Sequence, residues 1–217
     1  MEASVRRGRP SSYDRAQLIA VAKRLGPDRL SLTTVANELG VPRTTLYNSL
    51  TGPDSLGQLV LSSILSESGA TAVRPKRHQP WHDQLEAFAH RERTALLAAG
   101  PWLRFYDPST HITPDRLRLA DHLIEVIVDD GVPMSLAARA LALITQIVQQ
   151  SILDNLRLPW GDVDDSSPML DGLDPEVYPS LAAARLAFEK DSHGEAQYRF
   201  SLRCALAGIA AMVGPRT

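Results

Sequence analysis

The segment that decides the fold runs from Ser31 to Tyr47 and reads SLTTVANELGVPRTTLY. Ser31 is a residue type that commonly caps the start of a helix, and Gly40 is the type that ends one in a left-handed conformation. Between them the apolar residues recur at helical spacing: Leu32, Val35, Ala36 and Leu39. Pro42 is tolerated in a first helical turn and so begins a second short helix. Two helices joined by a tight glycine turn predict a helix-turn-helix.

A third helix is predicted just before this segment, over Tyr13–Leu25, where a Gly-Pro pair ends it. If the three helices pack on one another, the apolar residues are shared in a small core. The last helix then keeps a polar exposed face formed by Arg43, Thr44, Tyr47 and Asn48. These side chains can hydrogen-bond to base edges and phosphates, so the face is a candidate for reading DNA.

The charge is divided unevenly along the chain. Residues 1–52 contain eight Lys or Arg and four Asp or Glu, a balance of +4, which leaves −6 for the rest of a chain whose formal net charge is −2. Such a division is typical of a DNA-contacting module joined to a body that does not contact DNA, because attraction to phosphate is local. The basic part begins with residues 1–12, rich in Gly, Pro and Ser, which are either a minor-groove arm or a solvated terminus.

The run Arg7-Gly8-Arg9-Pro10, followed by LGVPRTTLY, resembles the DNA-binding domain of the TetR family of transcriptional regulators. The resemblance implies an all-α fold, with an N-terminal three-helix helix-turn-helix domain and a larger helical domain for ligand binding and dimerisation. It also implies a homodimeric repressor that binds palindromic double-stranded DNA and releases it when a small-molecule effector binds. The predicted DNA contacts are Arg7, Arg9, Thr33, Thr34, Pro42, Arg43, Thr44, Thr45, Tyr47 and Asn48.

The chain departs from the family pattern after Tyr47. Members commonly carry an aromatic residue there and a lysine at the start of the next helix, which holds a phosphate. Residues 48–54 instead read NSLTGPD, so this basic anchor is missing. We therefore expect the affinity for the DNA backbone to depend more on Arg7, Arg9 and Arg43.

The predicted domain boundaries are 1–68 for the DNA-binding domain, 69–80 for a linker and 81–217 for the body. The body is helical by apolar period, with helices predicted over Trp81–Ala99, Pro114–Asp130, Ser135–Leu158, Tyr178–Glu189 and Ala196–Val213. The acidic residues 159–179, rich in Gly and Pro, are predicted to form a loop.

Residues 198–209, YRFSLRCALAGI, resemble the closing segment of the TetR-type C-terminal domain. The resemblance implies a homodimer interface formed by helices 135–158 and 196–213. Small residues in the last helix permit close approach of a partner helix, although burial in the monomer core would leave a similar pattern.

An effector pocket in such a body would be lined by apolar and aromatic side chains with a few polar groups. The residues that fit this description are Trp102, Phe105, Tyr106, His111, Gln146 and Gln150. Gln146 and Gln150 are four residues apart and so share a helix face, which suits either a pocket or the edge of a dimer seam. A lone loop histidine such as His111 is more often simply exposed.

Other function classes are disfavoured. The six histidines show no metal-ligand spacing, and there is neither a phosphate-binding glycine loop nor a nucleophile elbow, so we expect no metal, no cofactor and no enzymatic activity. Cys204 is the only cysteine, which excludes a disulfide framework. With no secretory signal and no apolar run of about 18 residues, a cytoplasmic protein without a membrane span is expected.

Deleting residues 1–9 should remove much of the affinity for the operator, because the arginines at positions 6, 7 and 9 replace the missing lysine anchor. The measurement is a gel-shift titration at matched salt. Unchanged affinity after the deletion would show that the arm is only a solvated terminus.

Overall fold

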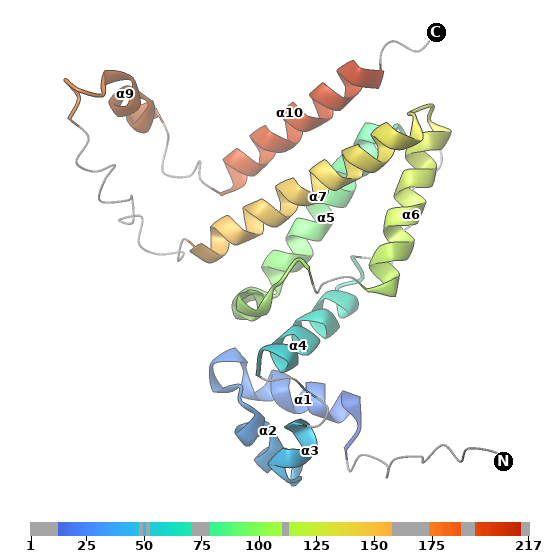
Figure 1. Cartoon of the computed structure of the whole chain (residues 1–217), viewed down its shortest axis with the longest axis vertical. Helices are drawn as coiled ribbons and strands as arrows, with labels where there is room; N and C mark the ends of the chain where they lie inside the picture. Colours follow the sequence, from blue (N-terminus) through green and yellow to red (C-terminus); the bar gives the residue numbers. More distant parts are fainter. Residues whose placement is uncertain are drawn as a thin grey trace, which may run out of the picture. The chain divides into compact units, whose positions relative to one another are not determined.

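The computed structural model describes residues 13–47, 50, 53–70, 79–109, 113–157, 174–187 and 194–213. Over these residues the regular structure is helical, without strands, which confirms the predicted all-α fold (Figure 1). The elements are α1 (Arg15–Leu25), η1 (Pro27–Arg29), α2 (Leu32–Leu39), α3 (Arg43–Tyr47), α4 (Pro53–Glu67), α5 (Trp81–Ala98), η2 (Gly100–Phe105), α6 (Pro114–Asp129), α7 (Met134–Arg157), α9 (Pro179–Ala187) and α10 (Glu195–Val213). Four predicted site residues lie outside the described residues: Arg7, Arg9, Asn48 and His111.

The chain divides into two compact units. Unit 1 contains α1 to α4 together with η2, and unit 2 contains α5, α6, α7, α9 and α10. The first border between them falls after Ser68. The segment with η2 is grouped with unit 1, although the predicted boundaries assigned it to the body.

In unit 1, the caps expected from the sequence are formed. The Ser31 hydroxyl accepts a hydrogen bond from the backbone N–H of Thr34 at 3.0 Å and so caps α2. At its other end, Gly40 is left-handed, with φ of 68°, and the Val41 N–H donates to the Ala36 carbonyl at 3.0 Å. This Schellman-type end stops α2 and turns the chain directly into α3.

In the short helix α3, Leu46 is completely buried. Leu18 and Ala22 of α1 and Val35 of α2 are also buried, and α2 packs against both α1 and α3. An ion pair between Arg24 and Glu38, 2.7 Å long, further ties α1 to α2. The three helices therefore share the small core that the apolar spacing predicts.

A second packing contact in unit 1 joins α4 to η2. A Cβ added at Gly57 of α4 would overlap the ring of Phe105 in η2, so the ring occupies the space that the glycine leaves. Arg104 of the same segment pairs with Asp28 at 2.7 Å and donates to the Pro27 carbonyl. These contacts explain why η2 belongs to unit 1.

Unit 2 is built around α7, which packs against α5, α6 and α10 (Figure 1). The inward face of α7 is apolar and includes Ala140, Ile144, Val148 and Ile152. The Trp81 N–H at the start of α5 donates to the Asp130 carboxylate at 2.9 Å, and Glu92 of α5 forms an ion pair with Arg116 of α6. These two polar contacts join α5 to α6 beside an otherwise apolar core.

Helix α7 corrects one expectation from the sequence. Residues Met134–Asp154 are long and apolar enough to cross a membrane, by length and composition alone. A core helix in a protein without a membrane span meets the same criterion, and α7 packs against three other helices of its unit. Packing within unit 2 therefore accounts for the apolar inward face of α7, while the outward face stays exposed.

Substituting Gly57→Ala should destabilise the protein. Alanine favours a helix over glycine by about 1 kcal/mol, but forcing a methyl group into a filled core costs about 1–3 kcal/mol. Thermal unfolding should therefore show a lower Tm. In a Phe105→Ala background the ring is gone, and the same Gly57→Ala change should instead raise the Tm. A rise in both backgrounds would contradict the packing of Phe105 on α4.

Candidate nucleic-acid interface and interhelical pocket

The exposed face of α3 is the first candidate site. Because Leu46 is buried, the side chains around the rest of the helix turn point to solvent. Pro42, Arg43, Thr44 and Tyr47 are all exposed, and half of the Tyr47 surface is accessible, at 50%. Thr45 is half-buried. The structure thus brings three of the predicted DNA contacts, Arg43, Thr44 and Tyr47, together on the exposed surface of α3, directly after Pro42.

Arg43 and Tyr47 interact on this face. The Arg43 Nη2 donates a hydrogen bond to the Tyr47 hydroxyl at 2.6 Å, and the guanidinium carbon lies 4.9 Å from the centre of the ring. The two residues are one helical turn apart, so a helix places them side by side. The guanidinium is held in one region of the surface while most of its N–H donors stay available.

The start of α2 offers a second predicted contact, Thr33, which is exposed. Its neighbour Thr34 is differently placed. The Thr34 hydroxyl donates to the Arg29 carbonyl at 2.9 Å and accepts from the Ser31 N–H at 3.1 Å. Thr34 is thus engaged in capping α2, a role that its position three residues after Ser31 could have indicated.

A model of the C-terminal domain of tetracycline repressor-like proteins matches residues 74–213. The chain belongs to the TetR family of transcriptional regulators. Members of this family are transcription factors and not enzymes, which agrees with the prediction made from the sequence. No curated protein matches the chain.

Several solved TetR-family structures share the fold. A possible TetR family transcriptional regulator from Streptomyces coelicolor A3(2) is 25% identical, over 92% of this chain and 100% of its own, with a TM-score of 0.70. A TetR variant from Acinetobacter baumannii AYE in complex with minocycline is 22% identical, over 94% and 99%, with a TM-score of 0.65. ActR from Streptomyces coelicolor, in complex with actinorhodin, is 21% identical, over 93% and 97%, with a TM-score of 0.68.

One face of α7 and one face of α10 are exposed although they are rich in apolar and small residues. On α7 this face includes Ala138, Ala142, Leu143 and Gln146. On α10 it includes Phe200, Cys204, Ala207, Gly208, Ala211 and Met212. Phe200 is 56% exposed and Met212 is 74% exposed, which is unusual for side chains of their size and polarity.

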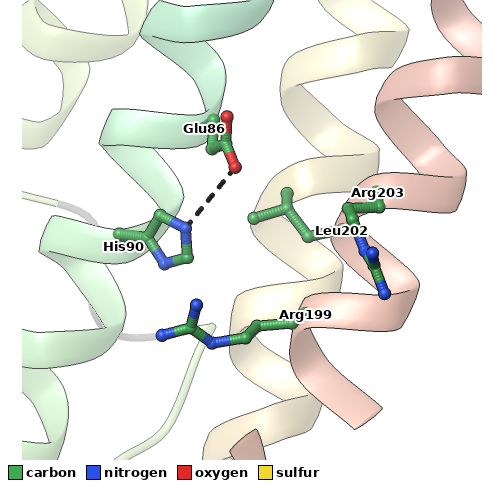
Figure 2. A pocket seen from close by; sticks show the side chains of 5 residues that line it. All are labelled: Glu86, His90, Arg199, Leu202 and Arg203. Atoms are coloured by element: carbon green, nitrogen blue, oxygen red, sulfur yellow. Dashed lines mark ion pairs between the residues drawn. The ribbon is translucent and has the colours of Figure 1, made fainter. Parts of the chain in front are cut away.

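A pocket of about 250 Å³ opens between α5 and α10 in unit 2. Figure 2 shows Glu86 and His90 on α5, with Leu202 and the two arginines Arg199 and Arg203 on α10. The Glu86 carboxylate lies 3.8 Å from the His90 Nε2. The lining is more polar than in a typical effector pocket. These residues were not predicted from the sequence, although Glu86 and His90 on α5, and Arg199 and Arg203 on α10, are each four residues apart and so share a helix face.

The residues predicted to line a pocket are dispersed. Trp102 and Tyr106 are buried within unit 1, and Phe105 of the same segment packs against Gly57. Gln146 and Gln150 are exposed on α7, where the Gln150 amide donates to Asp154 at 2.6 Å. Among the described residues, no group of three or more His, Cys, Asp or Glu side chains could hold a metal ion.

Behind the pocket, a buried arginine joins three helices of unit 2. Arg93 of α5 pairs with Glu195 of α10 at 2.5 Å and donates from Nε to the Ser151 hydroxyl of α7 at 3.2 Å. Its guanidinium carbon lies 4.5 Å from the centre of the Tyr198 ring. The Tyr198 hydroxyl lies 3.3 Å from the His90 Nδ1, and burial raises the pKa of Tyr198 to about 12. These contacts fix α10 on α5 and α7.

Glu195 makes this junction sensitive to acid. Partial burial raises the pKa of Glu195, but the hydrogen bond from Arg199 and the charges of Arg93, Arg199 and His90 outweigh burial, so the pKa lies below its usual value of 4.5. A lowered pKa in the folded state contributes stability that is present above pH 4.5 and is lost as the pH falls through the folded-state pKa.

Substituting Glu195→Gln should therefore reduce the loss of Tm that occurs between neutral pH and about pH 4, while lowering the Tm at neutral pH. Glu176→Gln is the matched control, because Glu176 is exposed and makes no ion pair within the described part of the chain. An equal acid dependence in wild type and Glu195→Gln would argue against the stabilising role of this carboxylate.

Proposed function

We propose that this TetR-family protein is a homodimeric, ligand-responsive repressor of the cytoplasm that binds a palindromic operator. The observation that supports DNA reading most directly is the exposed polar face of α3, formed by Arg43, Thr44 and Tyr47, with Pro42 exposed just before the helix. Thr33 at the start of α2 and the arginines of residues 1–12 would add contacts to the DNA backbone. Thr34, Thr45 and Asn48 are further proposed contacts.

The homodimer would use the exposed faces of α7 and α10. Both faces combine small residues with large apolar ones, which favours the close packing of two helices from each protomer into a four-helix arrangement. A twofold dimer would present two copies of α3. Two recognition helices read half-sites that lie about one helical turn of DNA, or a multiple of it, apart.

The response to an effector is proposed from the similar proteins. The titles of two similar structures report a bound small molecule, minocycline in one and actinorhodin in the other. In this chain, η2 connects α5 and α6 of unit 2 but packs on α4 of unit 1 through Phe105 and Gly57. A ligand that moved α5 or α6 would therefore act on α4 through the chain itself, and would favour dimers whose α3 spacing does not match the operator.

Substituting Gly208→Arg on α10 should break the dimer without unfolding the protomer, because a side chain at this position meets open space within the chain. Light scattering should show a monomer. Binding to a palindrome selected from random duplexes should weaken by about 100-fold or more, since the second half-site no longer adds to affinity. Circular dichroism should show unchanged helix content.

Gly194→Arg is the control, because an added side chain there also meets open space but lies outside the proposed interface. This variant should remain dimeric and should bind the palindrome as wild type does. A wild-type chain that is monomeric, or that selects no palindrome from random duplexes, would overturn the proposed function.

A further inference from the structure

We infer that Arg43 reads one guanine in each half-site of the operator, and that Tyr47 is the residue that positions it. This inference rests on the proposed function, because it assigns a base to a DNA-reading face. It goes further in naming the base pair and the pair of side chains that select it. Two observations support it. The Arg43 and Tyr47 side chains are in contact, and α3 is anchored in the core of unit 1 by Leu46.

The Arg43 side chain is restrained at two points. Its Nη2 donates to the Tyr47 hydroxyl at 2.6 Å, and its guanidinium carbon lies 4.9 Å from the centre of the Tyr47 ring. A long arginine on a helix surface otherwise samples many rotamers, and ordering it on binding is costly in entropy. The contact with Tyr47 removes part of that cost before DNA is bound.

The helix that carries this pair is also fixed. Leu46 lies between the two residues in sequence and is completely buried. Arg43, Thr44 and Tyr47, on the remainder of the α3 surface, are exposed. The guanidinium therefore has a defined direction relative to the core of unit 1, as a base-reading group requires.

Guanine is the base whose major-groove edge fits a guanidinium. It presents two adjacent acceptors, N7 and O6, whereas adenine places an N–H donor beside its N7. A guanidinium has five N–H donors and no acceptor, so one donor given to Tyr47 leaves four. Two of these can donate in parallel to guanine N7 and O6, and no other base edge accepts such a pair.

The test uses the full-length chain and a duplex that it selects from a random pool. Each guanine of one half-site is replaced in turn by 7-deazaguanine, which lacks the N7 acceptor. Inosine at the same position is the matched control, because it keeps both N7 and O6 and loses only the minor-groove amino group. At one position, 7-deazaguanine should weaken binding by about 10- to 100-fold, and inosine should change it little.

Three variants assign this effect to residues. Arg43→Ala should lose the discrimination between guanine and 7-deazaguanine at that position only. Tyr47→Phe keeps the ring but loses the hydroxyl acceptor, so it should retain binding while the discrimination falls by about 3- to 10-fold. Arg118→Ala removes the same charge from an exposed site in unit 2 and should leave the discrimination unchanged. Melting curves verify that each variant folds.

The outcomes separate this inference from the proposed function. A chain that selects no duplex refutes both. A chain that binds a palindrome but shows no guanine sensitive to N7 removal, or keeps that sensitivity in Arg43→Ala, refutes only the reading by Arg43. If Arg43→Ala weakens binding equally for all sequences and flattens the salt dependence, Arg43 contacts a phosphate, and the inference is wrong. Wild-type discrimination in Tyr47→Phe refutes the positioning role.

Discussion

The burial of Leu46 is the constraint on which the helix-turn-helix of unit 1 depends. Helix α3 has only five residues, which is far too short to be stable in isolation. It forms because Leu46 is removed completely from water where α3 packs on α2, and because the left-handed Gly40 ends α2 at the residue where the turn must begin. The side chains that could contact DNA make no such contribution to the core, so they are free to be polar.

In unit 2, too, buried and exposed helix faces differ in what they contribute. The inward face of α7 holds the core of the unit, while its outward face and that of α10 keep apolar residues that the protomer leaves exposed. Arg93 fixes α10 against α5 and α7 through Glu195, Ser151 and the ring of Tyr198. A buried arginine with this many partners is satisfied, and removing the Glu195 carboxylate would leave its charge buried without an anionic partner. The position of α10 is thus defined by contacts within unit 2.

Local signals in the sequence were sufficient for the helix-turn-helix of unit 1. Ser31 and Gly40 act where their residue types predict, because capping depends on the few residues around each helix end. The family was likewise indicated by a short signature, and a separate match over residues 74–213 shows it. Bounds in unit 2 shifted by only a few residues, as for α7, which begins at Met134 and not at Ser135.

Contacts between residues that are distant in sequence could not be predicted from such local signals. An aromatic segment with Trp102, Phe105 and Tyr106 has the composition of a pocket wall, but the space beside Gly57 of α4, distant in sequence, receives Phe105. The pocket between α5 and α10 depends on which faces of two helices meet, and spacing within each helix does not determine that. Residue types predicted what each helix face could do, whereas tertiary contacts decided which faces meet.

Hydrogen–deuterium exchange on the full-length chain, with and without a duplex that it selects, shows which helices DNA protects. If α3 is the reading helix, the backbone amides of α3 and of the start of α2 should exchange more slowly when the duplex is bound, and the core of unit 2 should change little. Protection confined to unit 2, with α3 unaffected by DNA, would contradict the account.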